Sequence, residues 1–236
     1  NTLEDNEAGE EWFGGMGYEI DRYDDPRRSD FYEMEGASII TLSGHGTADT
    51  IKFKDADNTT SSKCGVKNGE SETIGSYKYV GIEDVDLGAC KLVVLAACLT
   101  ASESEEYSRN ISENMVRVGG AEASIGWTEM VYSPLLSSYL YFLYMFLAQG
   151  NTIYESKNLV KEIYGDYDPS VYENVIYGNE DVTLEIPDGP IAQAEIPMPT
   201  YIPIKEKLNI DIATGDFEEL TEYLEETVDI FDRDTF

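Results

Sequence analysis

Cysteine and histidine are scarce in this chain of 236 residues, which holds three cysteines and a single histidine. Cys64, Cys90 and Cys98 form no Cys-x-x-Cys pair, so neither a disulfide framework nor a standard zinc knuckle is indicated. Because the number of cysteines is odd, at least one thiol stays free or pairs outside the chain. The Asp-x-Asp-x-Asp-Gly loop of a calcium-binding EF-hand is also absent from the sequence.

Positive charge is also scarce: 16 Lys and Arg residues stand against 47 Asp and Glu residues, which gives a net charge of −31 at pH 7. Binding of a nucleic acid normally requires clustered cations, and the only compact basic pair is Arg27-Arg28. We therefore expect no nucleic acid and no anionic membrane surface as a partner. The negative charge favours solubility and is compatible with a cationic or unfolded polypeptide as substrate.

Long apolar runs are missing as well. The longest stretch, Leu135 to Ala148, is shorter than the ~20 residues that a membrane-spanning helix needs. It predicts a buried helix, and no membrane insertion is expected. The chain begins at Asn1 without a charged-then-apolar leader, so we expect that a targeting peptide has been removed or left out.

Strand and helix patterns alternate over residues 1–165, which we interpret as one domain. The main predicted strands are 37–42, 91–97 and 123–127, and weaker strands are expected at 17–20 and in a hairpin within 51–80. The main predicted helices are 104–118, 134–149 and 152–163, the last capped by Thr152. This order indicates an α/β fold, a three-layer α/β/α arrangement around a mainly parallel sheet.

The pattern weakens after residue 165. Five of the eight prolines fall between Pro187 and Pro203, so residues 166–210 are predicted to be an extended connection with an edge strand at 182–186. Residues 211–236 are strongly acidic and carry an apolar stripe, which predicts an amphipathic helix that packs on the domain. By its position this tail is also a candidate intramolecular inhibitor.

The single histidine and one cysteine each follow a predicted buried strand. His45 stands in Ser-Gly-His-Gly after strand 37–42, and Cys98 follows strand 91–97. In open α/β sheets the functional groups gather beyond the carboxyl ends of the strands. If the two strands are neighbours, imidazole and thiol face one substrate, although either residue alone is more often a structural core residue.

The residue types suit acyl chemistry. A thiolate is a strong nucleophile for a carbonyl carbon, and histidine accepts or delivers the proton that the reaction moves. Gly46 permits close approach of a substrate, and its backbone N–H together with that of Cys98 forms a candidate oxyanion hole. No cofactor is required by this chemistry.

The two strand ends, with Gly119-Gly120-Ala121 and Ser124 to Trp127 following in order, resemble the His-Gly and Ala-Cys signature of the caspase-like cysteine peptidases, clan CD. The resemblance covers about residues 17–163 and is closest to the CHAT, gingipain-like and clostripain-like branch. It implies a cysteine endopeptidase with His45 as general base or acid, Cys98 as nucleophile, and a secreted or cell-surface bacterial protein. It also implies that Trp127 is a wall of the substrate pocket.

The sequence departs from that family in two places. Clostripain-like members that cut after Arg or Lys often carry an acid two positions before the cysteine, where this chain has Ala96. Basic specificity would then need another acid, and the candidates are Asp49, Glu103 and Glu129. The first strand of the family's sheet is also missing before Glu7, which suggests a processed or trimmed N-terminus.

Three other readings stay open. The first is a non-catalytic member of the same fold that binds peptides or serves as a scaffold, because a fold alone does not confer activity. In the second, His45 and the three cysteines form a zinc site, although their spacings match no usual finger. The third is a glutamine amidotransferase or related hydrolase, which the absence of a Gly-x-Cys-x-Gly elbow at Cys98 disfavours.

Overall fold

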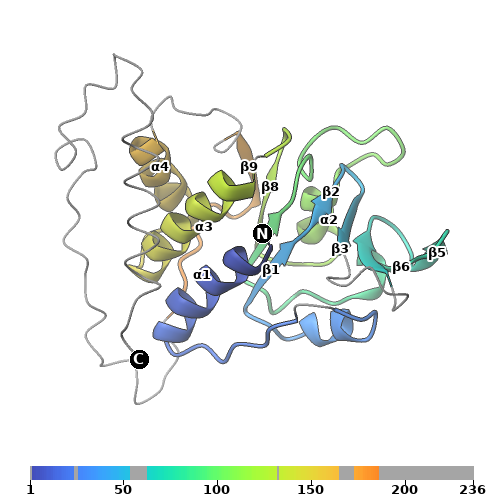
Figure 1. Ribbon diagram of the computed structural model, residues 1–236, viewed down its shortest axis with the longest axis horizontal. Coiled ribbons are helices and arrows are strands. Elements are labelled where there is room, and N and C mark those ends of the chain that lie inside the picture. The colour runs from blue at the N-terminus through green and yellow to red at the C-terminus, as the bar shows by residue number, and fades with distance from the viewer. Residues whose placement is uncertain (1, 24–25, 54–62, 132, 165–172, 186–236) are drawn as a thin grey trace. The chain divides into compact units, whose positions relative to one another are not determined.

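The computed structural model describes residues 2–23, 26–53, 63–131, 133–164 and 173–185 (Figure 1). The predicted acidic helix at 211–236 and most of the predicted connection at 166–210 lie outside these ranges. Within them the chain forms a mixed α/β fold with two β-sheets. None of the helices in the described ranges is both long enough and apolar enough to cross a membrane.

The first sheet has four strands in the order β1-β7-β8-β9. These strands are β1 (Ile39–Ser43), β7 (Leu92–Ala96), β8 (Ala123–Trp127) and β9 (Asn174–Gly178). The first three run parallel, and β9 runs antiparallel to β8. Every residue of β7 and β8 is buried, as expected for central strands that are covered on both faces. The predicted mostly parallel sheet is confirmed, and its three main strands were all expected.

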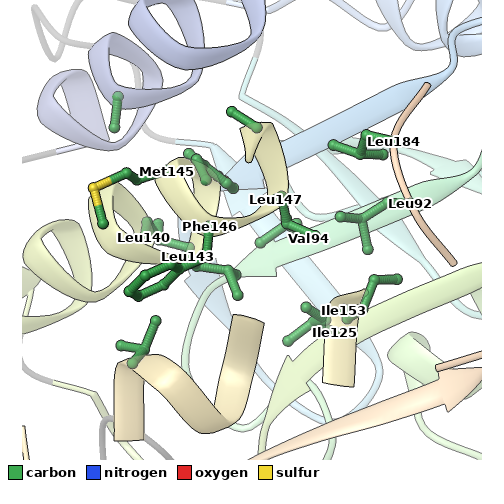
Figure 2. Close-up of a cluster of buried hydrophobic side chains, with 14 of the residues drawn as sticks. Leu92, Val94, Ile125, Leu140, Leu143, Met145, Phe146, Leu147, Ile153 and Leu184 are labelled. Carbon is green, nitrogen blue, oxygen red and sulfur yellow. The ribbon is translucent and has the colours of Figure 1, made fainter. Parts of the chain in front are cut away.

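Three helices cover one face of this sheet: α1 (Thr2–Gly15), α3 (Ser133–Ala148) and α4 (Ile153–Tyr164) (Figure 1). Alternate residues of β7 point to opposite faces, so Leu92 and Val94 enter the helical core. Figure 2 shows these two side chains with Leu143 of α3 and Ile153 of α4 in one apolar cluster. The apolar run from Leu135 to Ala148 is therefore a buried helix, as predicted.

The other face of the sheet packs on helix α2 (Ile111–Arg117) and on a second sheet. This sheet has the order β2-β3-β4-β6-β5. Its strands are β2 (His45–Gly46), β3 (Thr50–Phe53), β4 (Cys64–Lys67), β5 (Glu72–Ile74) and β6 (Tyr77–Gly81). Short 3-10 helices precede the first sheet and follow the second: η1 (Asp30–Met34) and η2 (Ile82–Asp84). The sequence had predicted only a hairpin for this region, because each strand is short and the β3–β4 and β4–β6 pairings join strands that are not adjacent in a tight hairpin.

Local hydrogen bonds explain where two of the helices begin. Thr152 and Glu155 form a capping box: the Glu155 N–H donates to the Thr152 hydroxyl at 3.1 Å, and the Glu155 carboxylate accepts from the Thr152 N–H at 2.9 Å. This confirms the predicted cap. Helix α2 begins after Asn110, whose side chain accepts from the Glu113 N–H at 2.9 Å. The predicted start at Ser104 is wrong, because its hydroxyl accepts from the Tyr107 N–H in a local turn instead.

Two predicted strands are not formed, and one strand was missed. Residues 17–20 continue from the end of α1, where the Tyr18 N–H donates to the Phe13 carbonyl, so they have no sheet partner. Residues 182–185 form no strand either. Strand β9 lies within the segment that was predicted to be an extended connection, and it pairs with β8 along five residues. The first sheet therefore extends past residue 165.

Candidate active site

The register of β1 and β7 places the histidine and the cysteine at equivalent positions. Ser43 is paired with Ala96 in these parallel strands, and His45 and Cys98 each follow two residues later. The pairing continues past the strand ends, because the Gly44 N–H donates to the Ala96 carbonyl at 3.3 Å. The condition on which the sequence argument depended, that the two strands are neighbours, is met.

His45 leaves the first sheet and enters the second. Its backbone pairs with Lys52 in the antiparallel β2–β3 ladder, and its side chain is exposed. Two hydrogen bonds close the hairpin that follows. The Thr47 N–H donates to the Thr50 carbonyl at 2.9 Å, and the hydroxyl oxygens of Thr47 and Thr50 lie 3.0 Å apart. The backbone that carries the imidazole is therefore fixed, while the ring itself faces solvent.

Gly46 packs directly against the loop that carries Cys98. A Cβ atom built on Gly46 would lie 2.3 Å from the Cys98 carbonyl oxygen, 2.8 Å from the Ala97 Cβ and 2.9 Å from the Thr100 Cγ2. Such distances leave no room for any side chain, so glycine is required here for close approach rather than for its backbone angles. The His-Gly segment and the cysteine loop thus form one packed unit.

The loop after β7 turns sharply at the cysteine. The Ala97 N–H donates to the Leu95 carbonyl at 2.7 Å, and Leu99 has a φ of +60°, a left-handed conformation that is costly for a residue with a branched side chain. The loop is held by neighbours, since the Leu99 N–H donates to the Glu129 carbonyl at 3.1 Å. This turn lifts Cys98 to a partly exposed position, whereas Ala97 before it is buried.

The sulfur of Cys98 contacts the backbone of Val131, which follows β8. The Val131 N–H donates to Sγ at 3.4 Å, and the Val131 carbonyl lies 3.8 Å from Sγ as an acceptor for the thiol. The sequence could not indicate Val131, because the contact is made by backbone atoms from a segment 33 residues away.

Two backbone amides at this site have no acceptor among the described residues. No hydrogen bond from the Cys98 N–H is formed within that part of the chain. Thr47 and Thr50 form a hydrogen-bonded pair, so the adjacent pair of Gly46 and Ile51 is of the non-bonded type, and the Gly46 N–H points away from β3. Both amides that were predicted to form an oxyanion hole are available for one.

The other two cysteines differ sharply from Cys98. Cys64 and Cys90 are buried, and none of the three forms a disulfide. Burial raises the pKa of the Cys64 thiol and raises the pKa of Cys90 to about 12. Among the described residues no group of His, Cys, Asp and Glu side chains could hold a metal ion, so the zinc arrangement of His45 with these cysteines is not formed.

Trp127, the predicted pocket wall, and Ala96, which stands where the family's specificity acid would line the pocket, both lie in the core. Trp127 at the end of β8 has no exposed surface, and its ring packs edge-on against Tyr139 with centroids 5.9 Å apart. Ala96 is 2% exposed and belongs to the same helical core. A pocket wall must reach the surface, so neither side chain faces a substrate in this structure.

The acidic candidates take three different positions. The Asp49 carboxylate accepts a hydrogen bond from the buried Asn68 amide at 2.9 Å, and the Asn68 backbone N–H donates to the Asp49 carbonyl at 2.9 Å, which indicates a structural role in the hairpin. Glu103 is exposed, and its side chain forms no hydrogen bond with a described residue. Glu129 is exposed and its backbone accepts from Leu99, the residue next to the cysteine. Of the three, Glu129 has the most direct link to the Cys98 loop.

The described surface also has a shallow hollow on α4. Its lining includes Glu155, Leu159 and Glu162 but neither His45 nor Cys98, so it is separate from the candidate site. The candidate site is instead an exposed rim formed by the ends of β1 and β7.

Comparisons with known proteins find similarity of backbone structure to solved chains. No protein-family model matches the chain, and no curated protein matches it. A solved chain described as "Structure of Protease" is similar, with a TM-score of 0.48 and 16% sequence identity. The match covers 69% of this chain and 39% of that chain, so the present chain spans well under half the length of the protein it matches.

Proposed function

We propose that the chain is a caspase-like cysteine endopeptidase of clan CD in which Cys98 and His45 form a catalytic dyad. The observation that carries the proposal is the Ser43–Ala96 register, which brings the only histidine and the only partly exposed cysteine to the same rim. The amides of Gly46 and Cys98, which have no acceptor among the described residues, support it independently. Because the sequence motifs resemble those of clan CD, the proposal includes the three-layer α/β/α fold of that family.

In the proposed mechanism His45 takes the proton of the Cys98 thiol, and the resulting thiolate attacks the carbonyl carbon of a peptide bond. The negative charge on the former carbonyl oxygen is stabilised by the Gly46 and Cys98 amides. When the C–N bond breaks, the amine leaves with the proton that His45 held. Water, deprotonated by His45, then hydrolyses the thioester, and the proton returns to the Cys98 sulfur.

The surface charge supports a basic polypeptide as substrate. The chain has a net charge of −31, and the exposed Glu129 side chain belongs to the segment bonded to the Cys98 loop. A carboxylate at that point would pair with a Lys or Arg side chain next to the scissile bond. Substrates with Lys or Arg should therefore be cut faster than matched substrates with Glu, and Glu129→Gln should reduce this preference.

The decisive experiment is cleavage of a peptide library by the wild type beside Cys98→Ala and His45→Ala. We expect the wild type to cut and both variants to lose at least 10²-fold in kcat/KM, since each removes a reacting group. Cys64→Ala is the matched control, because it removes a buried thiol from β4 and leaves the rim intact. Equal cleavage by wild type and Cys98→Ala would rule out the dyad.

A second candidate is a peptide-binding module without catalysis. It is favoured by one observation: the Cys98 sulfur is already engaged by both backbone groups of Val131. A peptidyl acyloxymethyl ketone separates the two functions, because a catalytic cysteine becomes covalently labelled and the labelling is lost in His45→Ala. Binding of peptides without any labelling of Cys98 would support the module.

A further inference from the structure

Thr100 is a buried polar residue that the proposed mechanism does not use. It stands two residues after Cys98 and has no exposed surface. Its hydroxyl oxygen accepts from the Trp127 N–H at 3.1 Å, and the hydroxyl proton has two acceptors within reach, the carbonyls of Ala97 at 3.2 Å and Leu95 at 3.5 Å. One side chain therefore joins the end of β7 to the end of β8.

This hydroxyl takes the place of direct strand pairing. The ladder between β7 and β8 stops at Val94 and Ile125, although β7 runs on to Ala96 and β8 runs on to Trp127. Beyond that pair, the Trp127 N–H donates to the Thr100 hydroxyl instead, and the hydroxyl proton is directed at the Ala97 and Leu95 carbonyls at the end of β7. The two strands are thus held apart at the edge of the sheet where Cys98 stands.

The surroundings are shaped to hold the threonine in this position. A Cβ built on Gly126 of β8 would lie 2.9 Å from the Thr100 Oγ1, so only glycine leaves room for the hydroxyl. The Thr100 carbonyl accepts from the Ser112 N–H in the first turn of α2 at 3.1 Å. On its other side the Thr100 methyl group faces Gly46, the residue after the histidine. Thr100 therefore contacts β7, β8, α2 and the His-Gly segment.

We propose that Thr100 is a positioning residue that fixes the Cys98 loop relative to the His45–Gly46 segment by holding β7 and β8 apart. The proposal rests on the proposed function, because it assigns Thr100 a role toward the thiol of that same site. Its hydroxyl supplies the link between the strands, and its methyl group supplies the contact with Gly46. Thr100 does not touch the substrate in this account.

Two near-isosteric variants separate these contributions. Thr100→Ser keeps the hydroxyl and loses the methyl group, whereas Thr100→Val keeps the shape and loses the hydroxyl. Thr73→Val is the matched control, because Thr73 is exposed on β5. The readouts are the rate of Cys98 alkylation by iodoacetamide, and kcat and KM for a cleaved peptide, all normalised to the folded fraction measured by circular dichroism.

We expect Thr100→Val to change the alkylation rate at least fivefold and to lower kcat at least tenfold with little change in KM. In Thr100→Ser the alkylation rate and kcat should lie closer to the wild-type values. A purely structural role would lower the folded fraction and leave the normalised rates unchanged, and that result overturns the proposal. If Thr100→Val does not fold, Thr100→Ala is compared with Thr100→Ser, because both lack the methyl group and only Thr100→Ser keeps the hydroxyl. Equal normalised rates in these two variants overturn the proposal.

Failure of the proposed function gives a different result. If Cys98→Ala cleaves peptides as well as the wild type, the dyad is wrong, whatever Thr100 does. The alkylation rate still tests Thr100 in that case, because it reports the position of the thiol without any peptidase activity. An unchanged alkylation rate in Thr100→Val then overturns the positioning role by itself.

Discussion

Gly46 and Cys98 are in such close contact that a single methyl group on Gly46 would lie 2.3 Å from the Cys98 carbonyl oxygen. This contact joins two residues that are 52 positions apart in the sequence. Gly46 belongs to β2 of the second sheet, and Cys98 belongs to the loop after β7 of the first sheet. It also sets the spacing between the two amides that are proposed to stabilise an oxyanion. A substitution at Gly46 therefore tests the geometry of the rim without removing either reacting side chain.

We predict that Gly46→Ala lowers kcat/KM for peptide cleavage at least 10²-fold, because the atoms that the new methyl group meets include backbone that must shift. The measurement is steady-state kinetics on the folded variant. Gly15→Ala is the control, since a Cβ at Gly15 meets nothing within 4 Å, and its activity should equal that of the wild type. Full activity in Gly46→Ala would show that this contact does not shape the site.

The three thiols should differ strongly in reactivity. Cys98 is partly exposed, whereas burial raises the pKa of Cys64 and raises that of Cys90 to about 12. Since the thiolate is the reactive form, iodoacetamide at pH 8 should label Cys98 alone in the native protein. Mass spectrometry before and after unfolding in urea checks this. Native labelling of Cys90 at the rate of Cys98 would contradict the buried position of Cys90.

Alkaline pH should destabilise the fold through Cys90. Below pH 9 its thiol is protonated in both states, so it contributes no pH dependence. Between its ordinary pKa of 9.0 and its folded value of about 12, the unfolded thiol loses its proton while the folded one keeps it. The unfolded state then binds fewer protons, so the free energy of unfolding falls as pH rises, by at most roughly 1.4 kcal/mol per pH unit from this group.

Urea unfolding of the wild type and of Cys90→Ala at pH 7 to 11 isolates that contribution. Other groups with raised pKa values, such as the partly buried Tyr141, lower the stability of both proteins alike at high pH. The stability advantage of the wild type over Cys90→Ala should therefore shrink above pH 9. A constant difference across this range would mean that the Cys90 thiol titrates in the folded state as it does in the unfolded one.

An acid at position 96 should not create basic specificity in this chain. Ala96 is 2% exposed and packs in the helical core, so Ala96→Asp would bury a carboxylate without a cationic partner. We predict a loss of roughly 2 kcal/mol or more in the free energy of unfolding. The control Ser76→Asp adds the same charge at an exposed turn and should change stability by less than about 0.5 kcal/mol. Thermal and urea unfolding of both variants measure the difference.

Much of the first sheet could be predicted from local pattern. The apolar runs at 37–42, 91–97 and 123–127 became β1, β7 and β8. The central strands β7 and β8 are buried throughout, because both of their faces are covered, whereas β1 at the edge of the sheet is buried at alternate residues. The positions of His45 and Cys98 after two of these runs were equally visible. The Thr152 cap was predicted correctly as well, since a capping box involves residues only three positions apart.

Other features depend on contacts that no short window contains. The second sheet joins β4 in parallel with β6 and antiparallel with β3, and strand β9 adds to β8 from about 50 residues further along the chain. Helix α2 is shorter than its apolar spacing suggested, because the Ser104 hydroxyl competes for the backbone. Trp127 was predicted as a pocket wall, yet the packing of Tyr139 against it makes it a core residue.

The sequence by itself determined which segments are buried, because the alternation and the length of apolar runs predict burial locally. It also determined that His45 and Cys98 follow two of these segments. Only the tertiary structure decided that β1 lies next to β7 in register, that Gly46 touches Cys98, and that Thr100 holds β7 and β8 apart. The physical reason is that the packing of the whole core sets which strands pair and in which register. Residues far apart along the chain take part in that packing, so no short segment contains the information.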